Sequence, residues 1–242
     1  MSDRVVVCIP TNFKSRQDIA AALHSKYGTD YVFLGRVLRA IASDVSCEID
    51  ICNADADLAH AFEIAGQNKI SATTLQQINH HQVIYLTSVE TGYDACLRIA
   101  QLAQVMLQIG GIAVKVDSAG IAHESKKWLA NYNSSDVFEI YALFVVLVEG
   151  DEYYYSCGMH NFGKADVAID LTEDISLAIY VMNVFNYYRL TESPILQDGH
   201  TFQPDIKCPV YQLKWIADRE YEPDSLLHNS HGRWCLVRLG IS

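Results

Sequence analysis

The sequence lacks the features that assign a chain to a membrane or metal-binding class. No segment reaches about 18 consecutive uncharged apolar residues, the length that a membrane-spanning helix requires. Neither an HExxH motif nor a pair of CxxC motifs is present. Cys47 and Cys52 stand at an odd separation on one predicted strand and so point to opposite faces, and the adjacent His80 and His81 diverge similarly. We therefore expect no membrane contact, no metal and no cofactor.

Basic residues are also scarce. The 242 residues include 18 Lys and Arg against 29 Asp and Glu, which gives a formal net charge of −11. Such a surface repels a phosphate backbone, so we expect no nucleic-acid partner. The same charge would steer a basic protein toward the chain, although many ordinary cytosolic proteins are equally acidic.

The cysteines do not form the pattern of a disulfide framework. The chain contains seven, an odd number, and they are scattered along it in a way that fits reduced thiols in buried strands and helices. The opening stretch MSDRVVVCIP has too short an apolar run for a signal peptide. We therefore expect a cytoplasmic protein.

The N-terminal part, residues 1–80, gives alternating strand and helix signals. Ser15, followed three residues later by Asp18, caps a predicted helix that Gly28 ends. Strands are predicted at DRVVVCIP, 31–34 and 47–52, and short helices at 55–65 and 71–80.

The next segment predicts a strand–helix–strand unit. HQVIYLTSV is a strand, Thr91 with Asp94 caps a helix that runs to about Ile109, Gly110 stops the helix, and IAVKV is the following strand. We expect the two strands to be parallel neighbours. The helix is apolar on most of its circumference, so it should be covered on more than one side.

Long strands are predicted after residue 137. FEIYALFVVLVEG and EYYYSCG flank a polar turn and indicate an antiparallel hairpin, and VAID is a further short strand. Thr172 is the expected N-cap of a helix over 173–188 that covers the sheet. The apolar stripe of this helix is expected to be Ile175, Ile179, Met182, Phe185 and Tyr188.

The tail, residues 192–242, holds four of the five prolines and is predicted to be rich in loops, with strands at YQLKWIA and RWCLVRL. No linker or repeat divides the chain. The prediction is a single α+β domain over 1–242, a mixed sheet covered by helices with a loop-rich C-terminal extension.

GMHNFGKAD, residues 158–166, has the spacing of the phosphate-binding motif GxxxxGK[ST], but Ala165 replaces the hydroxyl that holds magnesium. The motif also requires a helix after the lysine, whereas Val167 and Ile169 alternate with Asp166 and Asp170 as in a strand. We expect a glycine turn between two strands, without nucleotide binding.

The block from about His81 to Phe202 resembles an uncharacterised bacterial family, domain of unknown function 4261. The ordered features are VIYLTSV with its helix, GIAVKVDSAGIAHESKKW, the hairpin, GMHNFGKADVAI and a helix before DGHTF. The resemblance implies structural glycines at Gly158 and Gly163 and supplies no reaction or catalytic residues. By analogy, small acidic bacterial proteins of this kind sometimes act as immunity proteins in toxin systems.

Two loops contain residue types that catalysis uses. VDSAGIAHESKKW carries Asp117, Ser118, His123 and Glu124 beyond the end of a predicted parallel strand, and in α/β arrangements ligands favour such strand ends. His160 and Asp166 lie in the glycine loop. If both loops met at one sheet edge, the neighbouring carboxylate would make His160 a general base for that site. No G-x-S-x-G elbow surrounds the serine, and a Ser-Ala-Gly turn before a helix also explains these residues.

The hairpin supplies the candidates for partner binding. Tyr153 and Tyr155 stand beside the acidic residues Glu149, Asp151 and Glu152. Tyrosine on an acidic surface is typical of protein-binding faces, although ordinary sheet packing also uses it.

Taken together, these features predict a non-catalytic protein that binds another protein, most specifically an immunity-type inhibitor of a basic toxin domain. The alternative is a hydrolase-like enzyme whose Ser/His/carboxylate site lies in the Asp117–Glu124 and His160–Asp166 loops.

Overall fold

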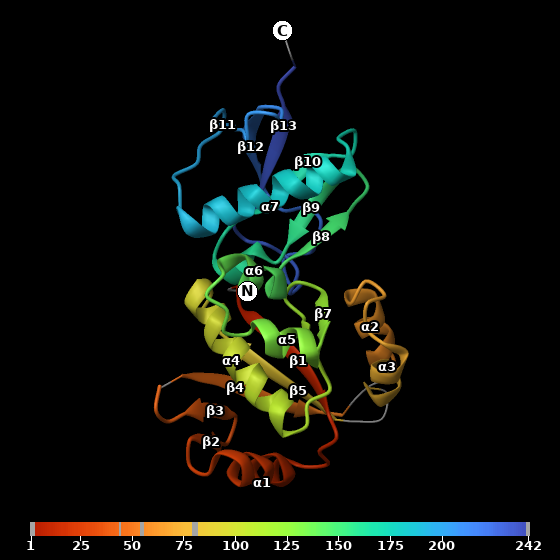
Figure 1. The fold of residues 1–242 in the computed structure, drawn as a ribbon, viewed down its shortest axis with the longest axis vertical. Coiled ribbons are helices and arrows are strands. Elements are labelled where there is room, and N and C mark those ends of the chain that lie inside the picture. The colour runs from red at the N-terminus through yellow and green to blue at the C-terminus, as the bar shows by residue number, and fades with distance from the viewer. Residues whose placement is uncertain (1–2, 44, 54–55, 79–81, 241–242) are drawn as a thin grey trace.

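The computed structural model describes residues 3–43, 45–53, 56–78 and 82–240 and arranges them around two sheets (Figure 1). His80 and His81 lie outside these residues. The first sheet has seven strands in the order β2-β3-β4-β5-β1-β6-β7, and every neighbouring pair is antiparallel. Its strands are β1 Val5–Thr11, β2 Tyr31–Leu34, β3 Val37–Ala40, β4 Ser46–Cys52, β5 Gln82–Ser88, β6 Ala113–Val116 and β7 Ile121–Glu124.

The second sheet has six strands in the order β11-β12-β13-β10-β9-β8 and is mixed, because β10 and β13 are parallel while the other pairs are antiparallel. Its strands are β8 Val146–Glu149, β9 Tyr153–Cys157, β10 Asp166–Asp170, β11 Thr201–Phe202, β12 Tyr211–Ile216 and β13 Arg233–Arg238. The tail therefore contributes three strands to this sheet, so it forms part of the sheet rather than a mere extension. The predicted α+β class is confirmed.

Helices cover both sheets (Figure 1). They are α1 Arg16–Tyr27, α2 Leu58–Ala65, α3 Ala72–Ile78, α4 Tyr93–Ile109, α5 Ser125–Asn131, α6 Val137–Phe144 and α7 Ile175–Thr191, with a 3₁₀ turn at Met159–Phe162. The α2–α3 pair lies beside β7, away from α4 (Figure 1).

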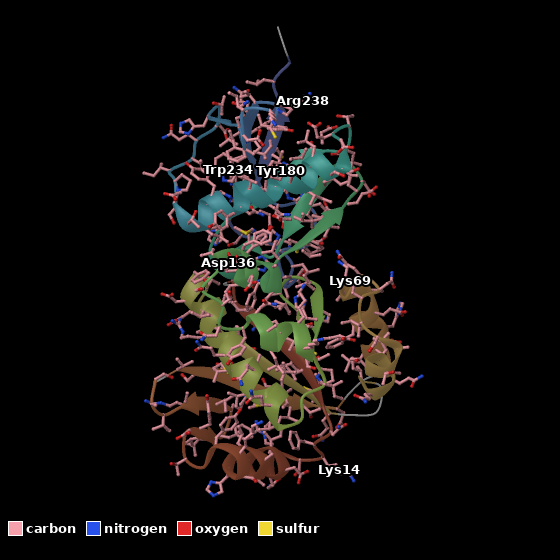
Figure 2. All side chains as sticks on the ribbon, in the orientation of Figure 1. Lys14, Lys69, Asp136, Tyr180, Trp234 and Arg238 are labelled. Atoms are coloured by element: carbon pink, nitrogen blue, oxygen red, sulfur yellow. The ribbon has the colours of Figure 1, made fainter. Side chains whose placement is uncertain are left out.

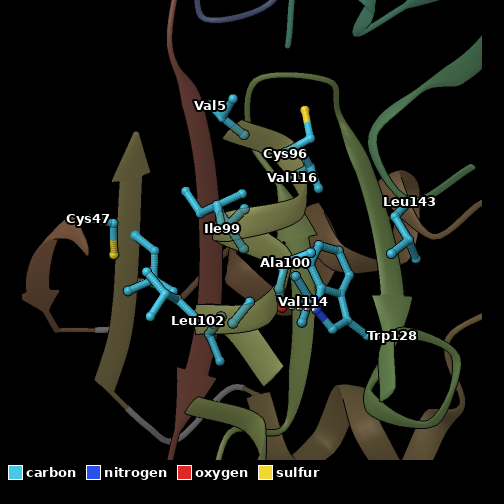
Figure 3. Packing of buried hydrophobic residues seen from close by; sticks show 14 of the residues in the cluster. Val5, Cys47, Cys96, Ile99, Ala100, Leu102, Val114, Val116, Trp128 and Leu143 are labelled. Carbon is cyan, nitrogen blue, oxygen red and sulfur yellow. Dashed lines mark hydrogen bonds between the residues drawn. The ribbon is translucent and has the colours of Figure 1, made fainter. Parts of the chain in front are cut away.

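Helix α4 forms the centre of the larger core, as its apolar circumference predicts. Figure 3 shows its residues Ile99 and Leu102 facing the strands of the first sheet, with Trp128 of α5 on the other side. The indole of Trp128 is fully buried and donates a hydrogen bond of 3.1 Å to the carbonyl oxygen of Ala100. Burial on several sides therefore holds α4 in place without a charged face.

The two strands of the strand–helix–strand unit, β5 and β6, are not neighbours, and this prediction is wrong. β1 lies between them and pairs antiparallel with both, so β5 and β6 run in the same direction one strand apart. Every residue of β1 is buried. An apolar strand buries most of its surface when it has neighbours on both edges, and β1 has them between β5 and β6. The prediction had paired β5 directly with β6.

Residues 137–144 form helix α6 where the sequence predicted the first half of a long strand. The carboxylate of Asp136, labelled in Figure 2, accepts a hydrogen bond of 2.8 Å from the backbone N–H of Phe138 and so caps the helix. Ile140, Tyr141, Leu143 and Phe144 are buried, a spacing that fits a helix buried on one broad face. A short apolar run gives no period that separates strand from helix.

Two predicted N-caps are replaced by their neighbours. Asp174, rather than Thr172, caps α7 by accepting from the N–H of Leu177 at 3.0 Å, and Thr172 instead donates to the carboxylate of Asp170. Gly92 precedes α4, so the side chain of Thr91 does not cap it.

The buried stripe of α7 is shifted relative to the prediction. Met182 and Phe185 are buried as expected, but Ile175, Ile179 and Tyr188 are 47%, 42% and 36% exposed. Their places on the sheet are taken by Ala178, Val181, Asn186 and Arg189. The buried face is therefore displaced by about one residue from the predicted stripe.

Candidate functional site

The glycine loop between β9 and β10 is a structural turn. Gly158 and Gly163 have φ angles of 118° and 67°, which favour glycine. A Cβ at Gly158 would lie 2.2 Å from the carbonyl oxygen of Phe144 and 2.8 Å from the Cβ of Ala119. β10 begins at Asp166, two residues after Lys164, so the helix that a phosphate-binding loop requires does not form, and the predicted glycine turn between two strands is confirmed.

Ser118 uses its hydroxyl within the fold. It lies in the turn between β6 and β7 and has no exposed surface. Its Oγ accepts a hydrogen bond of 3.2 Å from the N–H of Val6 and donates one of 2.7 Å to the Oδ1 of Asn161. The structure thus brings the two predicted loops together, and the contact is made through Asn161 rather than His160.

His123 is buried on β7. One ring nitrogen, Nε2, lies 3.0 Å from the carbonyl oxygen of Leu143, and the ring stands 6.0 Å from that of Trp128. Burial, with a further contribution from Lys127, lowers the pKa of His123 to about 4. The ring is therefore neutral at pH 7. Among the described residues, no hydrogen bond joins Ser118, His123 and His160.

His160 and Asp166 occupy the other side of the glycine loop. The carboxylate of Asp166 accepts hydrogen bonds from Asn229 Nδ2 at 2.6 Å, Ser156 Oγ at 2.9 Å and the N–H of Met159 at 3.2 Å. Burial raises the pKa of Asp166, and the charge of nearby His160 acts against that rise. His160 is 1% exposed, and neither ring nitrogen has a protein partner.

The imidazole of His160 lines a cavity of about 20 Å³ together with Asp3 and His228. Such a volume accommodates about one water molecule and no substrate. We name Ser118, His123, His160, Asn161 and Asp166 the buried loop cluster. Its members are all 3% exposed or less, and the polar groups of Ser118, Asn161 and Asp166 make their hydrogen bonds within the fold.

The C-terminal tail completes this polar region. Asn229 donates to the carbonyl oxygen of Lys164 at 3.1 Å as well as to Asp166, and its own N–H donates to Asp218 at 2.9 Å. Asp218 also accepts from Arg233 at 3.2 Å. The segment between β12 and β13 is thereby fixed against the glycine loop, an arrangement that no local sequence signal indicated.

An open groove of about 550 Å³ lies beside the β8–β9 hairpin, and we name it the hairpin groove. It is lined by Gly150, Asp151, Glu152, Tyr153, Tyr155, Ile216, Ala217, Arg219, Glu220 and Arg233. Four of the five residues predicted to bind a partner line it, and the fifth, Glu149, is exposed at the end of β8. The tail residues of the groove were missed, because only the pairing of β10 with β13 brings them to the hairpin.

Several side-chain contacts hold the floor of the hairpin groove. The guanidinium of Arg233 lies 4.4 Å from the ring centroid of Tyr155 and forms ion pairs with Asp218 at 3.2 Å and Glu220 at 3.8 Å. The hydroxyl of Tyr155 hydrogen-bonds that of Tyr221 at 3.0 Å, and burial raises the pKa of both phenols. Above this floor, Asp151, Glu152 and Arg219 are exposed.

A second cleft, of about 440 Å³, separates the α2–α3 turn from β7 and α5, and we name it the lysine cleft. Lys69, Lys126 and Lys127 line it, with His123 and Glu124. The sequence contained the Lys126–Lys127 pair within VDSAGIAHESKKW, but nothing local indicated that Lys69 lies across from it.

The described residues contain neither a candidate metal site nor a candidate membrane span. Within the described ranges, no group of three or more His, Cys, Asp or Glu side chains is placed to hold a metal ion. Cys47 is buried and Cys52 is exposed, and all seven cysteines are free. No helix in the described part of the chain is long and apolar enough to cross a membrane.

Comparisons of this chain with protein-family models, curated proteins and solved structures find no match. The resemblance to domain of unknown function 4261 therefore stays a prediction, and the function must be argued from the residues themselves.

Proposed function

We propose that this protein binds another protein through the hairpin groove and performs no catalysis. The observation that carries the proposal is the convergence of Tyr153, Tyr155, Asp151 and Glu152 on one open groove with a fixed floor. A preformed surface loses little conformational entropy when it binds, and tyrosine supplies contact area with a polar end.

The charge of the groove supports a basic partner. Arg233 is buried and paired with Asp218 and Glu220, so it offers little free charge to a ligand. The exposed carboxylates of Asp151 and Glu152, with Glu149 beside them, outnumber the single exposed guanidinium of Arg219. A lysine- or arginine-bearing segment would be steered to this face by the net charge of −11 and would lie against Tyr153.

The specific form of the proposal is an immunity-type protein that covers a basic toxin domain. Its acidic surface would attract the basic toxin domain, and its tyrosine side chains would contact and cover the surface of that domain. Neither role needs a reactive group. A cytoplasmic location belongs to this proposal, in keeping with the seven free thiols.

The hydrolase alternative has no observation in its favour. A nucleophilic serine needs a base within hydrogen-bond reach and a path for substrate. Ser118 instead donates to Asn161 and has no exposed surface, and His123 faces a backbone carbonyl group.

Affinity capture from the native host tests the proposal with two charge-reversed variants. Asp151→Lys/Glu152→Lys alters the groove, and Glu63→Lys/Glu192→Lys reverses two exposed carboxylates on α2 and at the end of α7. We expect wild type and the control to retain a basic protein whose binding weakens as salt rises, and the groove variant to lose it. Equal capture by all three would overturn the proposal.

A further inference from the structure

The lysine cleft reverses the charge of the rest of the molecule. Figure 2 shows Lys69 at the end of the α2–α3 pair that faces the second sheet, and Lys126 and Lys127 come from the start of α5 on the opposite wall. Within the part of the chain that the structure describes, no carboxylate forms an ion pair with any of these three ammonium groups. Lys69 donates instead to the side-chain carbonyl of Gln67 at 3.1 Å.

Hydrogen bonds from Ser71 and Thr74, with a further contribution from the charge of Lys126, lower the pKa of Glu124, the one carboxylate in the cleft. Glu124 accepts hydrogen bonds from the N–H of Ser71 at 2.8 Å and from the hydroxyl of Thr74 at 3.4 Å, which ties the start of α3 to the end of β7. Three cations with one occupied carboxylate leave the cleft net positive in a chain of net charge −11.

The lysines are held together against their mutual repulsion. Partial burial and the charge of Lys69 lower the pKa of Lys127, and both lysines disfavour a proton on His123. The turn that carries Lys69 is tightly built: Gln67 and Asn68 both have positive φ, at 51° and 58°, and a Cβ at Gly66 would lie 2.4 Å from Ile70. The repulsion between neighbouring like charges is a cost that a bound anion would offset.

We propose that the lysine cleft binds a small phosphorylated molecule, with the phosphate at the three ammonium groups. The volume of about 440 Å³ is in the range of small-molecule sites. Ala65, Ile70, Ile121, Ala122 and Ala130 give the cleft an apolar wall that would contact the organic part. Lysine recognises phosphate as a point charge and needs no fixed fork geometry. This site is independent of the hairpin groove.

The test uses adenosine diphosphate, adenosine monophosphate, adenosine and citrate as probes, each at about 5 mM, with sodium chloride added to equal ionic strength and no divalent cations. We expect both phosphates to raise Tm by about 2–5 °C, the diphosphate more than the monophosphate, and adenosine to leave Tm unchanged. The ring protons of His123, followed by NMR, should shift with the same two ligands, because that ring lines the cleft.

Matched variants locate the effect. Lys126→Gln/Lys127→Gln should weaken binding of the diphosphate about tenfold, whereas Lys14→Gln/Lys214→Gln, which removes two exposed lysines far from the cleft, should leave it within twofold. Lys69→Gln provides the same test from the opposite wall should the double variant fail to fold. A lack of response to either phosphate, an equal response in both double variants, or citrate binding as tightly as the diphosphate would overturn the proposal.

Discussion

The buried loop cluster and the hairpin groove contain similar side chains but place them in opposite settings. In the cluster, Ser118 and Asp166 are closed off from solvent, and each makes at least two hydrogen bonds within the protein. In the groove, Asp151 and Glu152 stand exposed above a floor of fixed side chains. Residue types alone therefore do not mark a site, since Ser118, Asn161 and Asp166 here form hydrogen bonds that hold the two loops in the fold.

This contrast predicts that the cluster controls stability and the groove controls binding. The largest loss of stability is expected for Asp166→Ala, which leaves the hydrogen-bonding groups of Ser156, Met159 and Asn229 buried without an acceptor. We expect the free energy of unfolding to fall by about 4 kcal/mol, measured by urea denaturation. Asp170→Ala, at the exposed end of the same strand, is the control and should cost far less.

The second effect concerns the glycine loop. Gly158→Ala places a Cβ against the backbone of Phe144 at a φ of 118°, and should lower stability by about 3 kcal/mol. Gly163→Ala, where the nearest atom, the hydroxyl oxygen of Thr91, is 3.5 Å away and φ is 67°, should cost about 1 kcal/mol. Similar losses for the two substitutions would show that close approach at Gly158 does not decide the loop conformation.

A pH dependence follows from His123. Its pKa is lowered to about 4 from 6.5, so the unfolded chain binds a proton more readily than the folded one between these values. The stability contributed by the neutral ring is complete above pH 6.5 and is lost as pH falls toward 4. Between pH 7.5 and 5 the loss should be about 2 kcal/mol, and His123→Gln should remove that part of the pH dependence. If the stability of wild type and of His123→Gln changed with pH in parallel, His123 would not be the source of this pH dependence.

The groove should give the smallest effect on stability. The Asp151→Lys/Glu152→Lys variant changes exposed side chains of the hairpin turn, so it should alter the free energy of unfolding by about 0.5 kcal/mol or less. Thermal denaturation followed by circular dichroism measures this. A loss comparable to that of Asp166→Ala would mean that the hairpin is part of the structural core.

Local signals predicted much of the fold and little of the site. The helix start at Ser15, where the hydroxyl accepts from Asp18, and the end of α4 at Gly110 depend on contacts within a few residues, and both are confirmed. The insertion of β1 between β5 and β6 depends on pairing across the chain, which no local pattern contains. The apolar run at 137–144 fits a strand or a helix equally, and the cap at Asp136 decides it.

The same limit applies to the sites. The hairpin tyrosines and carboxylates were recognisable because they are close in sequence, whereas Arg219 and Glu220 reach the groove only through the pairing of β13 with β10. Lys69 meets Lys127 only because α2 lies beside β7.

The most direct test of the central claim is the affinity of the captured partner for three forms of the protein, measured by calorimetry at a temperature where all are folded. The account predicts that Asp151→Lys/Glu152→Lys weakens binding about tenfold or more, while Ser118→Ala binds within about twofold of wild type. Unchanged affinity in the groove variant, with loss of binding in Ser118→Ala, would contradict the account and place the function in the buried loop cluster.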